Sequence, residues 1–227
     1  MKIYLKISSI LITLLVPFIL IMTAIRILIN PVFLEYEYNL PQFPPDPYGF
    51  TNEDRLYWGT LSMEYLINDS PVDFLATLTF PDGSPLYNER ELSHMVDVRL
   101  LVRGALTAWY WCMGLMVALG IVAWRTGNLK SLWKSISHGG WLTLGVIGLV
   151  IVSTFINFDQ LFTAFHGIFF EGDTWLFFAS DTLIRLYPLK FWSDAFIYMG
   201  IFTLVGAFFC IFVIGRLAQK AENKPAA

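Results

Sequence analysis

Residues 104–124 read GALTAWYWCMGLMVALGIVAW, a stretch without a charged side chain. A helix needs about 20 predominantly apolar residues to cross the hydrocarbon core of a bilayer, and this stretch is long enough. Three further stretches are similarly apolar: Ile7–Ile29, Trp141–Phe158 and Ala195–Leu217. Spanning strands would instead show segments of about ten residues with alternating polarity, and no such series occurs. The sequence therefore predicts four transmembrane helices.

The composition of the whole chain agrees with a membrane protein. Its 227 residues are 56% hydrophobic and 15% charged, whereas a soluble domain has about 45–50% apolar and about 25% charged residues. Both cysteines, Cys112 and Cys210, lie inside predicted spans, where a free thiol usually behaves as a small apolar side chain. We predict an all-α, multi-pass protein of the cell membrane.

The basic residues predict the orientation in the membrane. They lie before the first span, between the second and third spans, and after the fourth: Lys2, Lys6, Arg125, Lys130, Lys134, Arg216, Lys220 and Lys224. The other two segments are acidic, with twelve Asp/Glu against four Lys/Arg in residues 30–103 and five against two in residues 159–194. Lys and Arg are retained on the cytoplasmic side. Both termini are therefore expected in the cytoplasm, and no basic patch for a nucleic acid is present.

These assignments divide the chain into six segments. They are a first transmembrane helix at 1–29, an extracytoplasmic cap at 30–103, the second and third transmembrane helices at 104–158 with a cytoplasmic loop at 125–140, an interfacial amphipathic loop at 159–194, a fourth transmembrane helix at 195–217 and a cytoplasmic tail at 218–227.

Local signals predict helices and one short hairpin in the outer segments. Thr51 to Asp54 is typical of a helix N-cap, and Asn88 followed by Glu91 is a plausible cap for a helix that continues toward the second span. The Pro-Asp-Gly-Ser turn at 81–84 favours a hairpin. In the second outer segment, apolar residues on one face predict an interfacial helix that ends at Gly172, followed by a short helix at 181–187.

The three histidines are candidates for chemistry. His138 lies in the basic cytoplasmic loop and is expected to be an ordinary exposed residue. His94 and His166 lie one in each outer segment, near the membrane, and have Asp97 and Asp173 nearby in the sequence. Imidazole suits general acid–base catalysis near neutral pH, so these two could form a catalytic pair. Alternatively, each is a satisfied polar residue that holds loop structure.

A metal site and an anion site also have to be weighed. The two outer histidines with Asp97, Asp173 and Asp181 could form a mixed nitrogen and oxygen site, but no HExxH or other dense ligand motif occurs. We expect no metal and no other cofactor. Arg99, near the predicted outer interface, either extends to lipid headgroups or recognises a phosphate or carbonyl oxygen.

Two segments around the outer histidines resemble the signature segments of the lipoprotein intramolecular transacylase family. They are residues 91–99, ELSHMVDVR, and residues 165–175, FHGIFFEGDTW. The resemblance covers most of the chain in order, with the four spans included. Family members often have a proline shortly before the residue that matches Asp181, where this chain has Phe-Phe-Ala-Ser at 177–180.

The resemblance implies an activity and its partners. The protein would move an O-linked fatty acyl chain from the diacylglyceryl group of a bacterial lipoprotein to the α-amino group of its N-terminal cysteine. The partners would be that diacylated lipoprotein and membrane phospholipid. His94 and His166 would share the base and acid roles on the extracytoplasmic side, and Asp97 would orient His94. Arg99 or the Trp175 N–H would support the oxyanion, and Asp173 and Asp181 are further supporting or substrate-binding candidates.

Two other functional classes stay open at this point. A transporter would need polar groups at the midplane, and the spans hold few beyond Arg26. A non-enzymatic accessory protein could use the acidic cap to bind a partner.

The catalytic-pair hypothesis makes a geometric prediction. The two imidazoles should approach to hydrogen-bonding distance or to one bridging water, in a cavity lined by Phe162, Phe169 or Trp175. His94 lies ten residues before Gly104, about 15 Å along a helix. Either that helix breaks near Gly104, or residues 100–102 already lie in the headgroup layer, and we favour the second arrangement.

Overall fold

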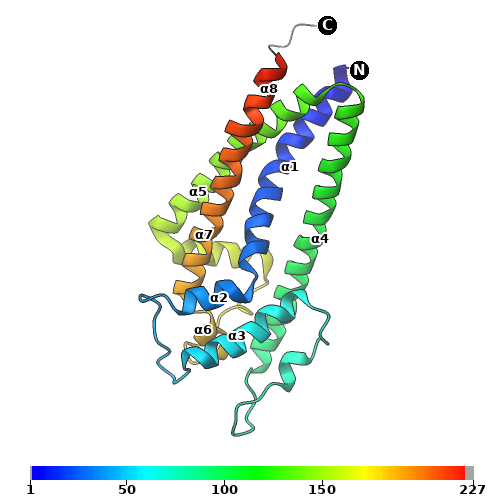
Figure 1. The fold of residues 1–227 in the computed structure, drawn as a ribbon. Coiled ribbons are helices and arrows are strands. Elements are labelled where there is room, and N and C mark those ends of the chain that lie inside the picture. The colour runs from blue at the N-terminus through cyan, green and yellow to red at the C-terminus, as the bar shows by residue number, and fades with distance from the viewer. Residues whose placement is uncertain (1, 223–227) are drawn as a thin grey trace. The chain divides into compact units, whose positions relative to one another are not determined.

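The structure, a computed structural model, describes residues 2–222, and these are largely helical (Figure 1). In chain order the elements are α1 (Lys2–Leu28), α2 (Pro31–Tyr38), α3 (Asn52–Ile67), the 3₁₀ helix η1 (Phe74–Thr77), α4 (Glu89–Arg125), α5 (Leu129–Phe169), α6 (Thr182–Leu186), α7 (Leu189–Phe208), the π-helical segment η2 (Phe209–Ile214) and α8 (Gly215–Glu222). Within this described part there is no strand, only an isolated antiparallel bridge between Thr79 and Pro85. The predicted all-α class is confirmed.

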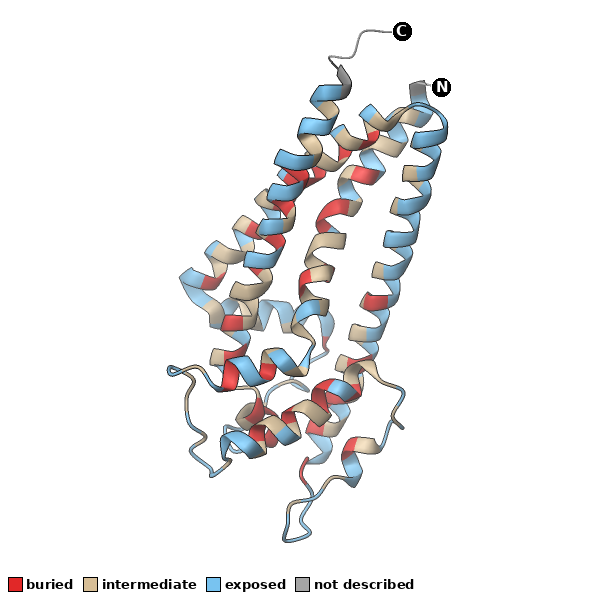
Figure 2. Ribbon diagram, viewed as in Figure 1, coloured by how far each residue is buried: buried red, intermediate tan, exposed pale blue. Residues whose placement is uncertain are grey.

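Four helices of the described chain are long and apolar enough to cross a membrane. They are Ile3–Leu28, Glu89–Arg125, Leu129–Phe169 and Leu189–Lys220. Each contains one predicted apolar stretch, so the protein is a multi-pass membrane protein. In the most apolar window of α4, 6% of the residues are buried, against 28% in the window of α1 (Figure 2). Lipid must therefore cover most of the surface of α4.

The helix bounds differ in several places from the predicted segments. α7 begins at Leu189, so residues 189–194 of the predicted interfacial loop are helical. α5 begins at Leu129, so residues 129–140 of the predicted cytoplasmic loop are helical and the connection to α4 is only residues 126–128. The predicted tail at 218–227 begins inside α8, which is described to Glu222, and residues 223–227 lie outside the described residues.

The chain forms two compact units. The first unit comprises the chain up to Arg26, Leu106–Ser153 and the chain from Ile197 onward. Its helices approach closely at small residues, as is common in membranes. A Cβ at Gly139 of α5 would lie only 2.5 Å from the Cβ of Val16 in α1.

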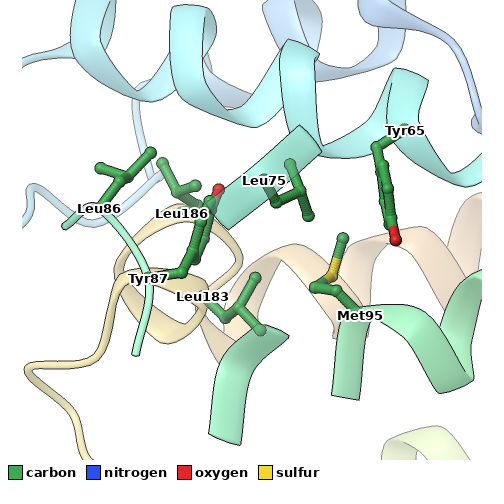
Figure 3. Packing of buried hydrophobic residues seen from close by; sticks show 7 residues of the cluster. All are labelled: Tyr65, Leu75, Leu86, Tyr87, Met95, Leu183 and Leu186. Carbon is green, nitrogen blue, oxygen red and sulfur yellow. The ribbon is translucent and has the colours of Figure 1, made fainter. Parts of the chain in front are cut away.

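The second unit comprises Ile27–Ala105 and Thr154–Phe196. Its main hydrophobic core joins α3, η1, the segment before α4, α4 itself and α6 (Figure 3): Tyr65, Leu75, Leu86, Tyr87, Met95, Leu183 and Leu186. A second cluster joins α2, α3 and α7: Leu34, Tyr38, Met63 and Phe191. Full burial of one such aliphatic or aromatic side chain contributes roughly 1.5–3 kcal/mol, so these clusters hold the short elements of the unit together.

Both predicted helix starts in this unit are confirmed. Thr51 Oγ1 accepts the N–H of Asp54 at 3.1 Å, and the Asp54 carboxylate accepts the N–H of Thr51 at 2.9 Å. Asn88 and Glu91 form the same reciprocal arrangement at the start of α4, with distances of 3.0 and 2.8 Å. These capping boxes satisfy backbone donors that a helix leaves free in its first turn.

The predicted hairpin was wrong in extent. Residues 74–77 form a 3₁₀ helix, and pairing is limited to the single bridge between Thr79 and Pro85. The turn itself exists, since the Phe80 N–H donates to the Ser84 carbonyl at 2.8 Å. The Leu86 N–H donates to the Leu78 carbonyl at 3.0 Å, but the Leu78 N–H donates to the Leu75 carbonyl of the 3₁₀ helix at 3.3 Å. The 3₁₀ helix therefore ends the pairing at Leu78.

The third span and the predicted interfacial helix are two parts of α5. The backbone breaks at Asn157, where φ is −161° and ψ is 94°, and the Asn157 side chain accepts the N–H of Gln160 at 3.1 Å. Asn157 therefore starts a new helical segment that carries His166 and ends at Phe169. Gly172 follows with φ +61°, a conformation that favours glycine. α6 then lies where a short helix was predicted.

Candidate active site

His94 and His166 lie together in the second unit. α4 carries His94 and the segment of α5 beyond Asn157 carries His166. Their ring centroids are 6.2 Å apart, with an angle of 22° between the ring planes. In the described chain no direct hydrogen bond joins the two rings. This separation between centroids is similar to the length of a water-bridged contact, in which the water makes two hydrogen bonds of about 2.6–3.2 Å each.

Aromatic rings surround His94. The Phe170 centroid lies 4.8 Å and the Phe177 centroid 5.3 Å from the imidazole centroid. The residue is 8% exposed, and its Nδ1 is buried without a hydrogen-bond partner. A buried polar atom without a partner is costly, so this nitrogen marks a position where a polar group of another molecule would be favourable.

His166 is more open than His94 and has a defined tautomer. Its ring lies 4.0 Å from the Phe162 ring and 4.7 Å from the Trp175 ring, measured between centroids. Its Nδ1 is 2.8 Å from the Phe162 carbonyl oxygen. A carbonyl oxygen only accepts hydrogen bonds, so Nδ1 carries the proton in this arrangement. In the neutral imidazole, Nε2 then keeps its lone pair.

Both imidazoles favour the neutral form. His94 lies ten residues before the apolar span of α4, and His166 lies beyond the break that ends the span of α5. Burial, and next the charge of a protonated His166, lower the pKa of His94 from 6.5 to about 4. Burial also lowers the pKa of His166, while the bond to the Phe162 carbonyl opposes that shift. Near pH 7 both side chains can accept a proton.

Trp175 and Asp181 lie on the loop between α5 and α6. The Trp175 ring packs on His166, and its Nε1 is buried without a hydrogen-bond partner. The Asp181 carboxylate accepts the N–H of Phe178 at 2.8 Å and the side-chain amide of Asn88 at 3.2 Å. Asp181 therefore shapes the loop, and Trp175 offers a free N–H donor beside the imidazoles.

Three other predicted site residues stand apart from the imidazoles. Asp97 and Asp173 are exposed, and because His94 Nδ1 has no partner, the orienting bond from Asp97 to this nitrogen is not formed. Arg99 is 7% exposed, so its guanidinium does not extend to lipid headgroups. Its Nη2 donates to the carbonyls of Asn68 at 2.9 Å and Ser70 at 2.8 Å. Arg99 thus ties down the loop after α3, and α4 continues through Gly104 without a break.

The aromatic neighbours of His94 were not foreseen in the sequence. Phe162 and Trp175, two of the residues expected to line a cavity, contact His166, whereas the Phe169 ring packs on Phe165 at a tilt. Phe177 belongs to the stretch in which family members often have a proline, so the departure from the family pattern was itself the available signal. Across residues 2–222 no three His, Cys, Asp or Glu side chains gather as a metal site would require.

Comparison with known proteins places the chain. The model of the family described as lipoprotein intramolecular transacylase Lit matches residues 10–192. The chain belongs to the lipoprotein intramolecular transacylase family. Its activity is therefore acyl transfer within a lipoprotein, from the glyceryl ester to the α-amino group of the N-terminal cysteine, and an accessory or transport function is not favoured.

Relatives of this transacylase cover its whole length. An uncharacterized protein of Aquifex aeolicus (strain VF5) is 29% identical over 220 residues, which cover 96% of this chain and 99% of the relative. The solved structure of the lipoprotein intramolecular transacylase Lit from Bacillus cereus superposes with a TM-score of 0.82 at 20% identity, covering 98% of this chain and 99% of that one. A variant of the same protein with one histidine replaced by alanine gives 0.77, at 20% identity and with 98% and 97% covered. At this identity the structural likeness shows the fold.

Proposed function

We propose that His94 and His166 supply the acid–base chemistry of the acyl transfer, on the extracytoplasmic side of the cell membrane. The observation that carries this proposal is the hydrogen bond from His166 Nδ1 to the Phe162 carbonyl. It leaves a lone pair on Nε2 of a neutral imidazole that stacks against a second neutral imidazole.

The proton balance of the reaction suits this pair. The α-amine has an unperturbed pKa of about 7.7–8, so near pH 7 it first loses its ammonium proton to solvent. The neutral amine then loses one further proton as the C–N bond forms. The departing glycerol oxygen gains one proton as the C–O bond breaks. His166 Nε2 takes the proton lost during C–N bond formation, and the pair delivers a proton to the glycerol oxygen. Because a charge on His166 opposes a charge on His94, the pair holds one proton at a time and ends each turnover neutral.

Trp175 is the best-placed donor for the oxyanion. The tetrahedral intermediate carries a negative oxygen, and one hydrogen-bond donor aimed at such an oxygen contributes a factor of about 10²–10³ to the rate. The Trp175 Nε1–H is buried and unpartnered beside His166. Arg99, the other predicted donor, also has a buried, unpartnered Nη1. Its Nη2 binds two backbone carbonyls and its guanidinium lies over the Tyr65 ring, whereas Trp175 packs on an imidazole.

No nucleophile from the chain is required. The amine and the ester belong to the same substrate molecule, and holding them in reach of one another supplies a large effective molarity. Cys112 and Cys210 lie within apolar helices, far along the sequence from the two histidines. The diacylated lipoprotein reaches the site through the bilayer, whose phospholipid also covers α4.

The outer location follows from charge and length. α4 has 37 residues, about 55 Å at about 1.5 Å per residue, whereas the hydrocarbon core is about 30 Å thick. Its basic C-terminal end belongs to the cytoplasmic side by the positive-inside rule, so the His94 end extends beyond the opposite face. Both termini of the chain are then cytoplasmic.

Expression in a bacterial strain that lacks N-acylating activity tests the proposal. Mass spectrometry of a lipoprotein N-terminus should show the N-acylated lyso form with the unchanged chain and with His138→Ala, and only the diacylated form with His166→Ala. Asp82→Cys and Ser180→Cys should react with an impermeant thiol reagent in intact cells, and Ser131→Cys should not. Product formation by His166→Ala, or labelling of Ser131→Cys, would contradict the proposal.

A further inference from the structure

The loop between α5 and α6 carries two aromatic neighbours of the histidines, and its position depends on α6. Trp175 packs on His166 and Phe177 packs on His94. α6 has only five residues, and a helix that short has no stability of its own. Contacts with other elements must therefore fix α6, and with it the end of the loop.

One carboxylate joins α6 to the helix that bears His94. Glu91 is 1% exposed. One of its oxygens accepts the N–H of Asn88 at 2.8 Å, which caps α4, and the other accepts the N–H of Leu183 at 2.7 Å, which lies in the first turn of α6. Burial raises the pKa of Glu91, and the bonds from the Asn88 and Leu183 N–H groups oppose that rise. Glu91 therefore caps two helices at once.

The other anchors of α6 come from elsewhere in the fold. Thr182 Oγ1 donates to the Leu86 carbonyl at 2.5 Å, and Tyr38 donates to the Leu186 carbonyl at 2.9 Å. Arg185 pairs with Asp46 at 3.0 Å. Two exposed contacts also join the start of α4 to the loop between α5 and α6: Arg90 Nη1 donates to the Leu176 carbonyl at 3.0 Å, and the Asn88 amide donates to Asp181 at 3.2 Å. Among the residues that bond to α6 itself, Glu91 is the one on α4, three residues and about one helical turn from His94. Leu183 packs in the same core cluster as Met95 (Figure 3).

We propose that Glu91 is a positioning residue of the transacylase, which by accepting the Leu183 N–H sets the place of the loop and so of Trp175 and Phe177 against the two imidazoles. This inference rests on the acid–base proposal above. A displacement of about 1 Å of a catalytic group can cost about 10²-fold in rate, so loss of the bond to Leu183 should act mainly on kcat.

Glu91→Asp isolates the bond between the two helices. The aspartate side chain is one methylene shorter, and Asp54 shows in this same protein that Asp at the third helical position still closes a capping box. The variant should keep the cap on α4 and lose the hydrogen bond from the Leu183 N–H. Glu91→Gln, which keeps the length and removes the charge, is a second variant in case one fails to fold. Glu89→Gln is the matched control, because Glu89 is an exposed acidic residue of the same first turn.

Steady-state kinetics with a diacylated lipopeptide test whether Glu91 affects catalysis. Glu91→Asp should lower kcat by about 10- to 100-fold with KM changed less than about threefold, and Glu89→Gln should change neither. Trp175→Phe should cost less in the Glu91→Asp background than in the unchanged chain, since the indole is already displaced. The proposal would be overturned if the losses in kcat from Trp175→Phe and Glu91→Asp multiplied in the double variant. A kcat for Glu91→Asp within about twofold of the control would also overturn it.

Hydrogen exchange tests, without a measurement of activity, whether Glu91 holds the loop and α6 in place. Glu91→Asp should speed exchange of the amides in residues 176–183 and leave those of α3 unchanged. Unchanged exchange in residues 176–183, or equally faster exchange in α3, would contradict positioning by Glu91. If the histidine variants keep activity while this loop loosens as expected, the acid–base proposal fails and the structural link through Glu91 stands.

Discussion

Two pairs of buried titratable side chains occupy the second unit, and they differ in what their free atoms can reach. One pair is His94 and His166. The other is Glu37 of α2 and Asp194 of α7, the latter in an ion pair with Lys190. Glu37 is fully buried, and neither of its carboxyl oxygens has a hydrogen-bond partner of good geometry. Burial, and next the Asp194 carboxylate, raise the pKa of Glu37 to about 8, while Lys190 opposes the shift.

The comparison shows that burial and a shifted pKa do not identify a site by themselves. Glu37 lies beside the cluster of Leu34, Tyr38 and Phe191, and nothing opens it to a substrate. His166 is partly exposed, keeps a lone pair on Nε2, and has the free N–H of Trp175 beside it. Perturbed groups are candidates for function. Unpartnered buried atoms occur at both pairs, so the exposure of His166 is what separates the site from the fully buried Glu37.

Removal of either imidazole should have the largest effect. We expect His94→Ala and His166→Ala each to lower the single-turnover rate of a purified lipopeptide reaction by at least about 10³-fold, because residues that act as a unit fail together. The single-turnover rate of the double variant should be no lower than that of the slower single variant. His138→Ala should keep the full rate. Losses that multiply in the double variant would contradict a shared mechanism.

Removal of the Trp175 indole N–H should have the second-largest effect on the rate. We expect Trp175→Phe, which keeps an aromatic ring and removes the donor, to lower kcat by about 10²-fold with little change in KM. Trp192→Phe is the matched control, since Trp192 also packs on Phe162, at 6.2 Å between centroids, but is exposed. A Trp175→Phe enzyme with unchanged kcat would remove the oxyanion role.

The pH profile should reveal the neutral histidines. With its pKa lowered to about 4, His94 stays unprotonated as the pH falls from 8 to 5, and the lowered pKa of His166 places any break from that residue below pH 6.5. From pH 8 to 6.5, log(kcat/KM) should therefore fall with a slope of one that reflects only the substrate amine. A histidine with the ordinary pKa of 6.5 would cost a further factor of about 30 at pH 5. A break in the profile near pH 6.5 would show that burial does not hold the pair neutral.

Glu37 should affect stability and leave activity almost unchanged. Its pKa is 4.5 in an unfolded chain and about 8 in the fold, so between these values the folded state binds the extra proton and stability falls as pH rises. Glu37→Gln should abolish that slope and raise stability at pH 8 by on the order of 1–3 kcal/mol, with activity within about twofold. Thermal unfolding in detergent at pH 5 and 8 measures this, with the exposed Glu35→Gln as control. An unchanged slope would refute the assignment.

The sequence predicted those features that depend on neighbouring residues. Apolar runs predicted the spans, and the capping boxes at Thr51 and Asn88 predicted two helix starts, because both signals lie within a few residues of their effect. The hairpin prediction failed in extent because residues 74–77 form a 3₁₀ helix that uses the Leu78 N–H. The role of Arg99 could not be read from the sequence, because its carbonyl partners are 31 and 29 residues away and carry no side-chain signal.

The candidate site was predicted only in part. The meeting of His94 with His166 was expected because their two segments resemble one family, and helical periodicity alone does not bring them together. Trp175 was named for its N–H, which the structure leaves unpartnered. The Glu37 and Asp194 pair went unnoticed, since its members lie on elements far apart in the chain.

The most direct test follows the acyl chain itself. A lipopeptide with one isotopically heavy O-linked chain is mixed with excess purified transacylase, the reaction is stopped during the first turnover, and the intact protein and the lipopeptide are weighed by mass spectrometry. Direct transfer to the substrate amine predicts that the heavy chain passes from ester to amide while the mass of the enzyme never changes. A heavy acyl group trapped on the enzyme, for example on Cys112, would contradict the account.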